Sequence, residues 1–462
     1  MVRKNDYKLG VCPIGKVLFS HKDTLRQKEE MYKKLDEMNI PYVSIEDVIE
    51  DGLICSMDQV EPAVEALRAK GADALFIPHC NYGTESAAGL IAKKLGLPTL
   101  LWAPRDEMPI ADGSRLRDSL CGCFATSRVL LSLGVNFEYI VNCSVDDSKF
   151  TSGIDRFVRA SRAAKMVRTA RIGQIGMRIP FFWCTINDEA QLLNKFGVQI
   201  EPFDLVEILK ATDKKVAADA EIYKQELKNM DWLDRSNIDT DEGLIKSLAM
   251  RDVLFELADK FKIDAFAVQN FDSMLEYLGA GAGVGLAMIE EKIPCSAETD
   301  IYGSLSSIII EAVEGGDLPS FFPEYTIRHP ENENAVLMWH ASAAPSLRHP
   351  ESGKVRVLAP SILTTYPPVS VQFFLKEGDM TACRFDGLNG KFALGAGEGR
   401  SIKGPKTREV YTWMEVDDWA QWERKLIEGP FIHHSACVYG KYADAMQLVA
   451  KFLGVDFVRF DK

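Results

Sequence analysis

The chain begins with short apolar stretches that alternate with longer stretches whose apolar residues recur every three or four positions. Residues 8–15 and 72–78 are typical of buried strands, and residues 23–38 and 84–96 of amphipathic helices. Strands that alternate with helices predict a parallel, doubly wound sheet. We therefore predict a Rossmann-like α/β domain over residues 1–165.

A second alternating stretch begins at the strand-like residues 171–178. It continues through a long polar helical segment from about residue 205 to residue 262, and then through the apolar strands 264–271 and 295–300. The pattern again favours a parallel sheet covered by helices. We predict a central α/β domain over residues 166–330.

The pattern changes after residue 330. Residues 335–342, 369–387 and 391–399 are strand-like, and glycine, proline and Asp-Gly turns join them. A final amphipathic helix is expected over residues 441–454. The predicted fold class is therefore α/β, with two doubly wound parallel-sheet domains followed by a β-rich, barrel-like C-terminal domain over residues 331–462.

Composition narrows the class of protein. The 47% apolar and 26% charged residues are typical of a globular protein, and no run of about 18 apolar residues predicts a membrane span. The first residues lack the apolar core of a signal peptide, and ten scattered cysteines without a CxxC pair indicate reduced thiols. A net charge of −13 argues against nucleic acid as a partner. We expect a cytoplasmic enzyme that acts on a small molecule.

Two carboxylates, Glu298 and Asp300, stand one residue apart in the otherwise small and apolar segment CSAETDIYG. Strand alternation would point both side chains the same way, and like charges repel unless a cation, a proton or water separates them. They lie where a buried strand ends and a helix begins, which is where open α/β sheets bind ligands. The alternative interpretation is a solvated loop.

Three histidines lie beside apolar strands: His340 in VLMWHAS, and His433 and His434 in FIHHSACV. Oxygen ligands with one or two imidazoles suit Mn²⁺, Mg²⁺ or Co²⁺ better than structural zinc. Together with Glu298 and Asp300 these histidines predict a divalent metal site. The alternative is that each histidine is a hydrogen-bonded structural residue.

A further acid is expected at the strand-to-helix junction QNFDSMLEYLG, which offers Asp272 and Glu276. Asp272 can also cap the following helix, and the two roles are compatible. The glycine run from Gly279 to Gly285 lies inside a helix-like stretch rather than in a turn from strand to helix, so we predict close helix-to-sheet packing there and no dinucleotide site.

Three C-terminal motifs in order, AETDIYGSL, LMWHASAAP and IHHSACVYG, resemble signatures of the L-fucose isomerase and L-arabinose isomerase superfamily. Residues 81–107 and 113–122 also resemble that superfamily's first domain. The resemblance implies an aldose–ketose isomerase that works through an enediol, with Mn²⁺ or another divalent cation such as Co²⁺ or Mg²⁺. It also implies a homo-oligomer, a trimer or hexamer, with active sites at subunit contacts.

The resemblance extends to individual residues. It implies that Glu298 and Asp300 bind metal and move protons, and which acid does which stays open. Asp272, with Glu276 as the alternative, corresponds to the first catalytic acid, and His340 and His434 correspond to metal ligands. We expect four substrate-binding residues: Gln269, Asn270, Trp339 and His433.

The sugar itself is not specified. An L-fucose-like or L-arabinose-like sugar or a modified hexose is expected, including an anionic one such as sulfoquinovose, whose charge could be met by Lys16, Arg105, Arg115 or Arg117. His21 and His79 could reach a neighbouring subunit's site. The competing functions are a metal-dependent sugar lyase or epimerase and a non-enzymatic sugar-binding protein.

Overall fold

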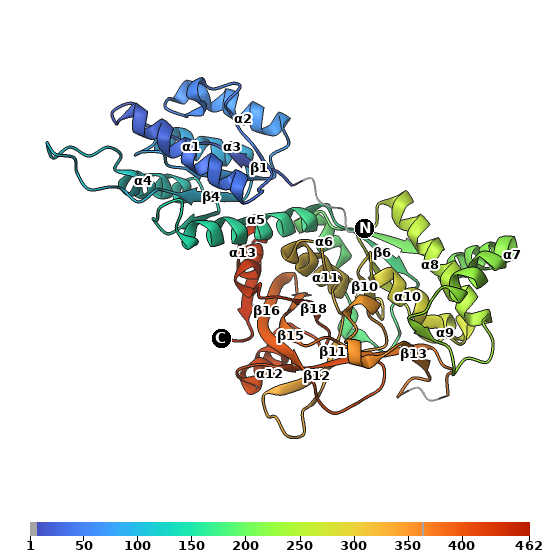
Figure 1. Ribbon diagram of the computed structural model, residues 1–462. Coiled ribbons are helices and arrows are strands. Elements are labelled where there is room, and N and C mark those ends of the chain that lie inside the picture. The colour runs from blue at the N-terminus through green and yellow to red at the C-terminus, as the bar shows by residue number, and fades with distance from the viewer. Residues whose placement is uncertain (1–6, 363–364) are drawn as a thin grey trace. The chain divides into compact units, whose positions relative to one another are not determined.

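The computed structural model describes residues 7–362 and 365–462 (Figure 1). Residues 1–6, which belong to the N-terminus considered for a signal peptide, lie outside the described part. The chain divides into two compact units, one ending at residue 165 and the other running from residue 166 to residue 462. Within the described part, no helix is long and apolar enough to cross a membrane.

The N-terminal unit is built on a five-stranded sheet in the order β2-β1-β3-β4-β5, with every pair of neighbours parallel. The apolar run of β3 is buried at every position, which explains why it forms a central strand. The strands are β1 (Leu9–Val11), β2 (Tyr42–Val43), β3 (Ala74–Pro78), β4 (Thr99–Trp102) and β5 (Phe137–Ile140). The helices are α1 (His21–Glu37), α2 (Val60–Ala69), α3 (Glu85–Leu95), α4 (Ser119–Ser132) and α5 (Ser148–Thr169), the last of which runs past residue 165.

The second unit contains a four-stranded parallel sheet in the order β10-β9-β6-β7. Its strands are β6 (Arg171–Ile175), β7 (Gln199–Phe203), β9 (Ala265–Val268) and β10 (Cys295–Ala297). Its helices are α6 (Glu189–Phe196), α7 (Leu205–Lys228), α8 (Glu242–Phe261), α9 (Ser273–Leu278), α10 (Ala282–Glu290) and α11 (Ile301–Glu314).

The polar segment expected to be helical from residue 205 to residue 262 is interrupted. The turn-forming residues after α7 end that helix, and the short strand β8 (Leu233–Asp234) precedes α8. The glycine run packs closely, as expected: a Cβ atom on Gly283 would lie 2.7 Å from the carbonyl oxygen of Val369, next to the strand that begins at Ser370. The run also packs on a helix, because a Cβ atom on Gly285 would lie 2.2 Å from the carbonyl oxygen of Ser247 on α8.

The same unit continues into a ten-stranded mixed sheet, which confirms the β-rich C-terminal part. Most neighbours are antiparallel, whereas β13–β8, β14–β17 and β16–β19 are parallel. Its other strands are β11 (Glu324–Arg328), β12 (Ala335–His340), β13 (Val355–Leu358), β14 (Ser370–Phe374), β15 (Gly378–Leu388), β16 (Lys391–Ile402), β17 (Val410–Glu415), β18 (Ala436–Tyr439) and β19 (Asp456–Arg459). Two helices accompany it: α12 (Trp419–Glu428) and α13 (Ala443–Leu453).

Helix α11 joins the two sheets of this unit. It packs against β9 and β10 of the parallel sheet and against β15 and β18 of the mixed sheet (Figure 1). Its residues from Ile301 to Val313 are all buried, in keeping with the apolar run SLSSIII. The N-terminus of α11 is therefore held where side chains from both sheets can meet.

Candidate functional site

The segment between β10 and α11 is a turn and not an extension of the strand. Glu298 and Thr299 both have left-handed backbones, with φ of 59° and 54°. Such a conformation costs a non-glycine residue about 1–2 kcal/mol, and strain of this kind is concentrated at functional sites. The strand alternation expected for Glu298 and Asp300 is therefore broken, and the two carboxylates meet different surroundings.

Asp300 is fully buried and caps the N-terminus of α11. Its Oδ1 accepts a hydrogen bond of 2.9 Å from the backbone N–H of Gly303, and its carboxylate forms an ion pair with the buried Arg384. Burial raises the pKa of Asp300, but the Arg384 guanidinium and the hydrogen bond from His434 outweigh it and hold this pKa well below its usual range. The structure thus places Asp300 behind the site, as an ionised acceptor.

His434 connects the two carboxylates. Its Nδ1 lies 3.0 Å from Oδ2 of Asp300, and its Nε2 lies 3.4 Å from Oε2 of Glu298. The imidazole is fully buried, in the segment that leads into β18. Burial lowers the pKa of His434, whereas the carboxylates of Asp300 and Glu298 and a third acid, Glu324, raise it well above its usual value.

Glu324 is the residue that the sequence did not single out. It begins β11, where it pairs with Trp339 of β12 and forms an isolated bridge with His434. Its Oε1 lies 3.6 Å from Nε2 of His434 and 3.7 Å from Nε2 of His433. Burial raises the pKa of Glu324, but the neighbouring His434 and His340 lower it to about 2.

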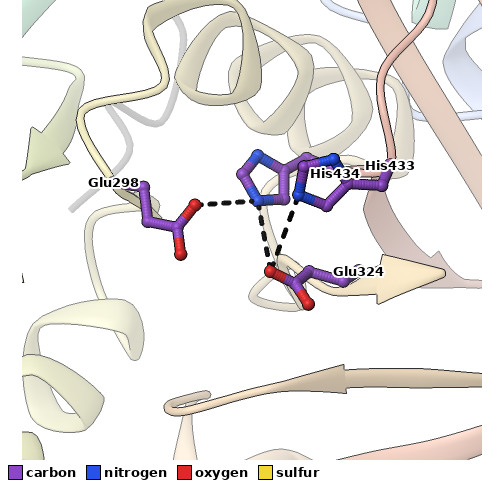
Figure 2. Close-up of side chains that lie close together, drawn as sticks. All are labelled: Glu298, Glu324, His433 and His434. Carbon is purple, nitrogen blue, oxygen red and sulfur yellow. Dashed lines mark ion pairs between the residues drawn. The ribbon is translucent and has the colours of Figure 1, made fainter. Parts of the chain in front are cut away.

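Four side chains thus converge in one group: Glu298, Glu324, His433 and His434 (Figure 2). One ligand atom from each lies within 4.8 Å of all the others. No second group of this kind occurs in the part of the chain that the structure describes. The structure does not bring Asp300 into this group, because its oxygens face Arg384, Gly303 and Nδ1 of His434.

The spacing of this group fits a cation. Ligand atoms lie roughly 2.1 Å from a small divalent cation, so neighbouring ligands lie roughly 3.0–3.4 Å apart. The separations of 3.4 and 3.6 Å around Nε2 of His434 are close to this range and longer than a good hydrogen bond. Both Nε2 of His434 and Oε2 of Glu298 are buried without a hydrogen-bond partner among the described residues.

His340 lies next to the group. It ends β12, its ring centre is 6.0 Å from that of His434, and its Nδ1 accepts a hydrogen bond from the backbone N–H of Ala341. Its Nε2 is buried without a partner among the described residues, and burial lowers the pKa of the ring. A neutral imidazole with a free Nε2 therefore stands beside the four converging side chains.

A cavity of about 370 Å³ opens from these residues, a volume suited to a small ligand. Glu298, Glu324 and His340 line it, together with several apolar side chains: Phe181, Phe182, Phe271, Leu275, Leu286, Ile362 and Val369. No lysine or arginine is among its described lining residues. The cavity thus combines an acidic and imidazole-bearing wall with mainly apolar walls.

Two of the four expected substrate-binding residues line the cavity, and the other two do not. Asn270 and Trp339 line the cavity. The side-chain oxygen of Asn270 accepts from the backbone N–H of Glu298, and the indole N–H of Trp339 donates to the buried Glu409. Gln269 is turned toward the backbone N–H of Met177, and His433 belongs to the group of four.

The candidates for the first catalytic acid lie outside the cavity. Asp272 and Glu276 are both exposed, and neither lines the cavity. Asp272 stands at the start of α9 without capping it through its side chain and accepts a hydrogen bond from the hydroxyl of Tyr366. The second carboxylate that faces Nε2 of His434, beside Glu298, is Glu324.

The N-terminal cations and histidines have partners of their own. Lys16 pairs with Glu85, Arg115 with Asp118, Arg117 with Asp23 and His21 with Asp51, and His79 is buried against the carbonyl of Tyr82. The side chain of Arg117 is 1% exposed, so it is not free to meet a ligand. Lys16, Arg105 and Arg115 are the cations of this set that retain accessible side chains.

Comparison with known proteins identifies relatives. A sequence model described as the fucose/sulfoquinovose isomerase N-terminal domain matches residues 10–168. Sulfoquinovose isomerases of Priestia aryabhattai and Priestia megaterium (strain ATCC 12872 / QMB1551) are each 23% identical over 414 residues, covering 87% of this chain and 89% of theirs. The chain is therefore similar to the fucose/sulfoquinovose isomerases. A third sulfoquinovose isomerase, from Alkalicoccus urumqiensis, is 24% identical over 377 residues, covering 80% of this chain and 82% of its own.

These similarities confirm the resemblance seen in the sequence motifs. The matched N-terminal domain ends at residue 168, so the converging carboxylates and histidines lie beyond it. The alignments with the superfamily's sulfoquinovose isomerases extend over most of the chain, including the second unit.

Proposed function

We propose that this protein is a metal-dependent aldose–ketose isomerase that acts on a pentose or hexose through an enediol. The family match and the names of the three relatives support isomerisation of a sugar. The observation that carries the proposal is the convergence of Glu298, Glu324, His433 and His434 at cation-like separations, with both carboxylates on the wall of a sugar-sized cavity.

We assign the cation to Mn²⁺, with Co²⁺ or Mg²⁺ as substitutes, because mixed carboxylate and imidazole ligands suit these ions. Glu298, Glu324 and Nε2 of His434 would hold it, with His433 and His340 beside them. Held by these residues, a divalent cation would polarise the sugar's carbonyl and hydroxyl oxygens and would stabilise the negative charge that develops on them.

The chain's own residues supply the proton transfer. Isomerisation moves a proton between C1 and C2 of the sugar, which requires a positioned base and acid. Glu298 is suited to this because Oε2 is buried, has no hydrogen-bond partner among the described residues and belongs to a side chain that lines the cavity. Glu324 is the second carboxylate within reach, and the indole of Trp339 gives the sugar ring an apolar face.

We further propose that the substrates include an anionic hexose such as sulfoquinovose, the sugar named for the relatives. The described lining of the cavity offers no cation for a sulfonate. We assign that role to accessible cations of the N-terminal unit, Lys16, Arg105 or Arg115, supplied by a neighbouring copy in a trimer or hexamer. The ten free cysteines fit the reducing cytoplasm that we propose as its location.

The test is to incubate Mn²⁺-loaded protein with a panel of aldoses in D₂O, including L-fucose, L-arabinose and sulfoquinovose. Ketose formation with deuterium at C2 of recovered aldose supports the proposal. Cleavage products would indicate a lyase, and a changed configuration at C2 without ketose would indicate an epimerase. Binding without any conversion would leave a sugar-binding protein and would refute the assignment of an isomerase.

A further inference from the structure

A buried arginine stands behind the candidate metal site. Arg384 lies on β15 with a side chain that is 0% exposed, and it pairs with two carboxylates. Its Nη1 and Nη2 donate to the two oxygens of Asp300, the second at 3.1 Å, and its Nε donates to Oδ2 of Asp386 at 2.9 Å. A two-pronged pair of this kind fixes the plane of the Asp300 carboxylate.

The hydrogen bonds of Asp300 determine its protonation state. Oδ1 accepts from Nη2 of Arg384 and from the backbone N–H of Gly303, and Oδ2 accepts from Nη1 of Arg384. Each of these partners can only donate, so Asp300 must act as an ionised acceptor. The remaining partner of Oδ2, Nδ1 of His434 at 3.0 Å, must therefore carry a proton.

This arrangement decides what the other nitrogen of His434 can do. In a neutral imidazole with a proton on Nδ1, the lone pair is on Nε2. Nε2 points toward Glu298 and Glu324. A lone pair on Nε2 and the carboxylate oxygens are all acceptors, so this arrangement is favourable only if a cation lies between them. Metal-binding histidines generally have such a partner on the second nitrogen, and its removal weakens metal binding.

We propose that Arg384 and Asp300 form a positioning pair that fixes His434 with its proton on Nδ1 and presents Nε2 to a divalent cation. The inference rests on the proposed function, because it assumes that the group of four binds metal. Arg384 touches neither the cavity nor the converging atoms, so it acts through Asp300 and His434. A buried ion pair is a poor stabilising element by itself, since apolar residues of similar volume replace it without loss.

Asp300→Asn provides the sharpest test. An asparagine has one oxygen, which the donors Gly303 and Arg384 would hold at the Oδ1 position. Its NH₂ group would then take the Oδ2 position, where Nη1 of Arg384 loses its acceptor, and would face Nδ1 of His434. That nitrogen would have to accept, which moves the proton to Nε2. The variant should bind Mn²⁺ about 10–100-fold more weakly than the wild type, measured by calorimetry with Mn²⁺ alone.

Arg384→Gln should weaken Mn²⁺ binding in the same direction, and Arg384→Lys should restore part of it because the positive charge returns. Asp386→Asn is the matched control, since Asp386 accepts from Nε of Arg384 and not from the two nitrogens that hold Asp300, and it lines a separate cavity. It should keep Mn²⁺ affinity within about threefold. Asp300→Asn or Arg384→Gln protein that is folded by circular dichroism and binds Mn²⁺ like the wild type would overturn the proposal.

A second readout separates this proposal from the metal assignment. In protein labelled with ¹⁵N-histidine and free of metal, His434 should show a proton on Nδ1 that exchanges slowly with water, and Asp300→Asn should abolish that signal. If the wild type binds no Mn²⁺, the proposed function fails. The signal of the Nδ1 proton still shows whether Asp300 holds His434 in the proposed form. An unprotonated Nδ1 in the wild type would overturn the positioning role whatever the metal result.

Discussion

Replacing Glu324 by Gln tests the candidate metal site at the residue that differs from the sequence prediction. The sequence favoured Asp300 as the second carboxylate ligand, whereas the structure places Glu324 in the group of four. The change keeps the shape of the side chain and removes the negative charge that lies 3.6 Å from Nε2 of His434. With the cation bound, Glu324 and the cation would form a buried charge pair, and removing one partner of such a pair costs about 3–5 kcal/mol. Because the Glu324 side chain is 18% exposed, solvent screens part of this interaction and we expect the lower end of the range.

A loss of about 3 kcal/mol corresponds to a Kd for Mn²⁺ that is about 100-fold higher, since each 1.4 kcal/mol is a factor of ten. The assay is calorimetric titration of metal-free protein, with the melting temperature and circular dichroism spectrum checked first. Glu428→Gln is the control, because that carboxylate pairs with Arg424 on the surface helix α12. It should leave the Kd unchanged.

The refuting result is specific. If Glu324→Gln folds and binds Mn²⁺ with the wild-type Kd, Glu324 is no ligand, and the separations around His434 do not report a metal site. If Glu298→Gln also binds normally, the four converging side chains are only a buried network of ionised groups. The metal-dependent mechanism would then have no support from the geometry.

Three further predictions concern chemistry and stability. EDTA should abolish turnover. Mn²⁺ at about a hundredfold excess over its Kd should raise the free energy of unfolding by about 2.7 kcal/mol, and a melting temperature that is the same with and without Mn²⁺ would contradict binding. Glu298→Gln should lower kcat by about 10²–10⁴ in the D₂O exchange assay, and a wild-type rate would exclude Glu298 as the base. Burial raises the pKa of Glu311 from 4.5 to about 7, so its contribution to stability is complete below pH 4.5 and is lost as the pH rises through 7. Glu311→Gln, which keeps an acceptor for Ser320, should remove up to about 3 kcal/mol of that decline in urea melts between about pH 5 and about pH 8, and an unchanged decline would show that Glu311 titrates normally.

Much of the fold could be predicted because local pattern and tertiary structure agree. Fully apolar runs such as those of β3 and β9 are buried at every position, as strands covered on both faces must be. The hydrophobic pattern did not predict the interruption of the helical segment at β8. A strand of two residues is defined by its pairing with β13 more than 120 residues later, and not by its own sequence.

The site was predictable only where a motif is contiguous. Glu298 and His434 stand within short motifs at the ends of strands, and the structure brings them together. The common direction expected for Glu298 and Asp300 failed because it assumed strand geometry. Two consecutive left-handed residues turn the chain there, and periodicity cannot anticipate a turn without glycine or proline.

Glu324 and Arg384 share a different reason for having been missed. Period-two alternation assigns a side chain to a face of a strand, but it does not say which residue lies opposite. Glu324 reaches His434 through a bridge between segments 110 residues apart, and Arg384 reaches Asp300 across 84 residues because α11 packs on β15. A sequence pattern ordinarily predicts that an acid or an arginine in a strand faces solvent. The side chains of Glu324 and Arg384 face inward because of the register of the mixed sheet, which the pattern does not contain. The charges that would bind and position a cation here are therefore set by long-range packing, and substitutions at Glu324 and Arg384 test that packing as directly as they test the chemistry.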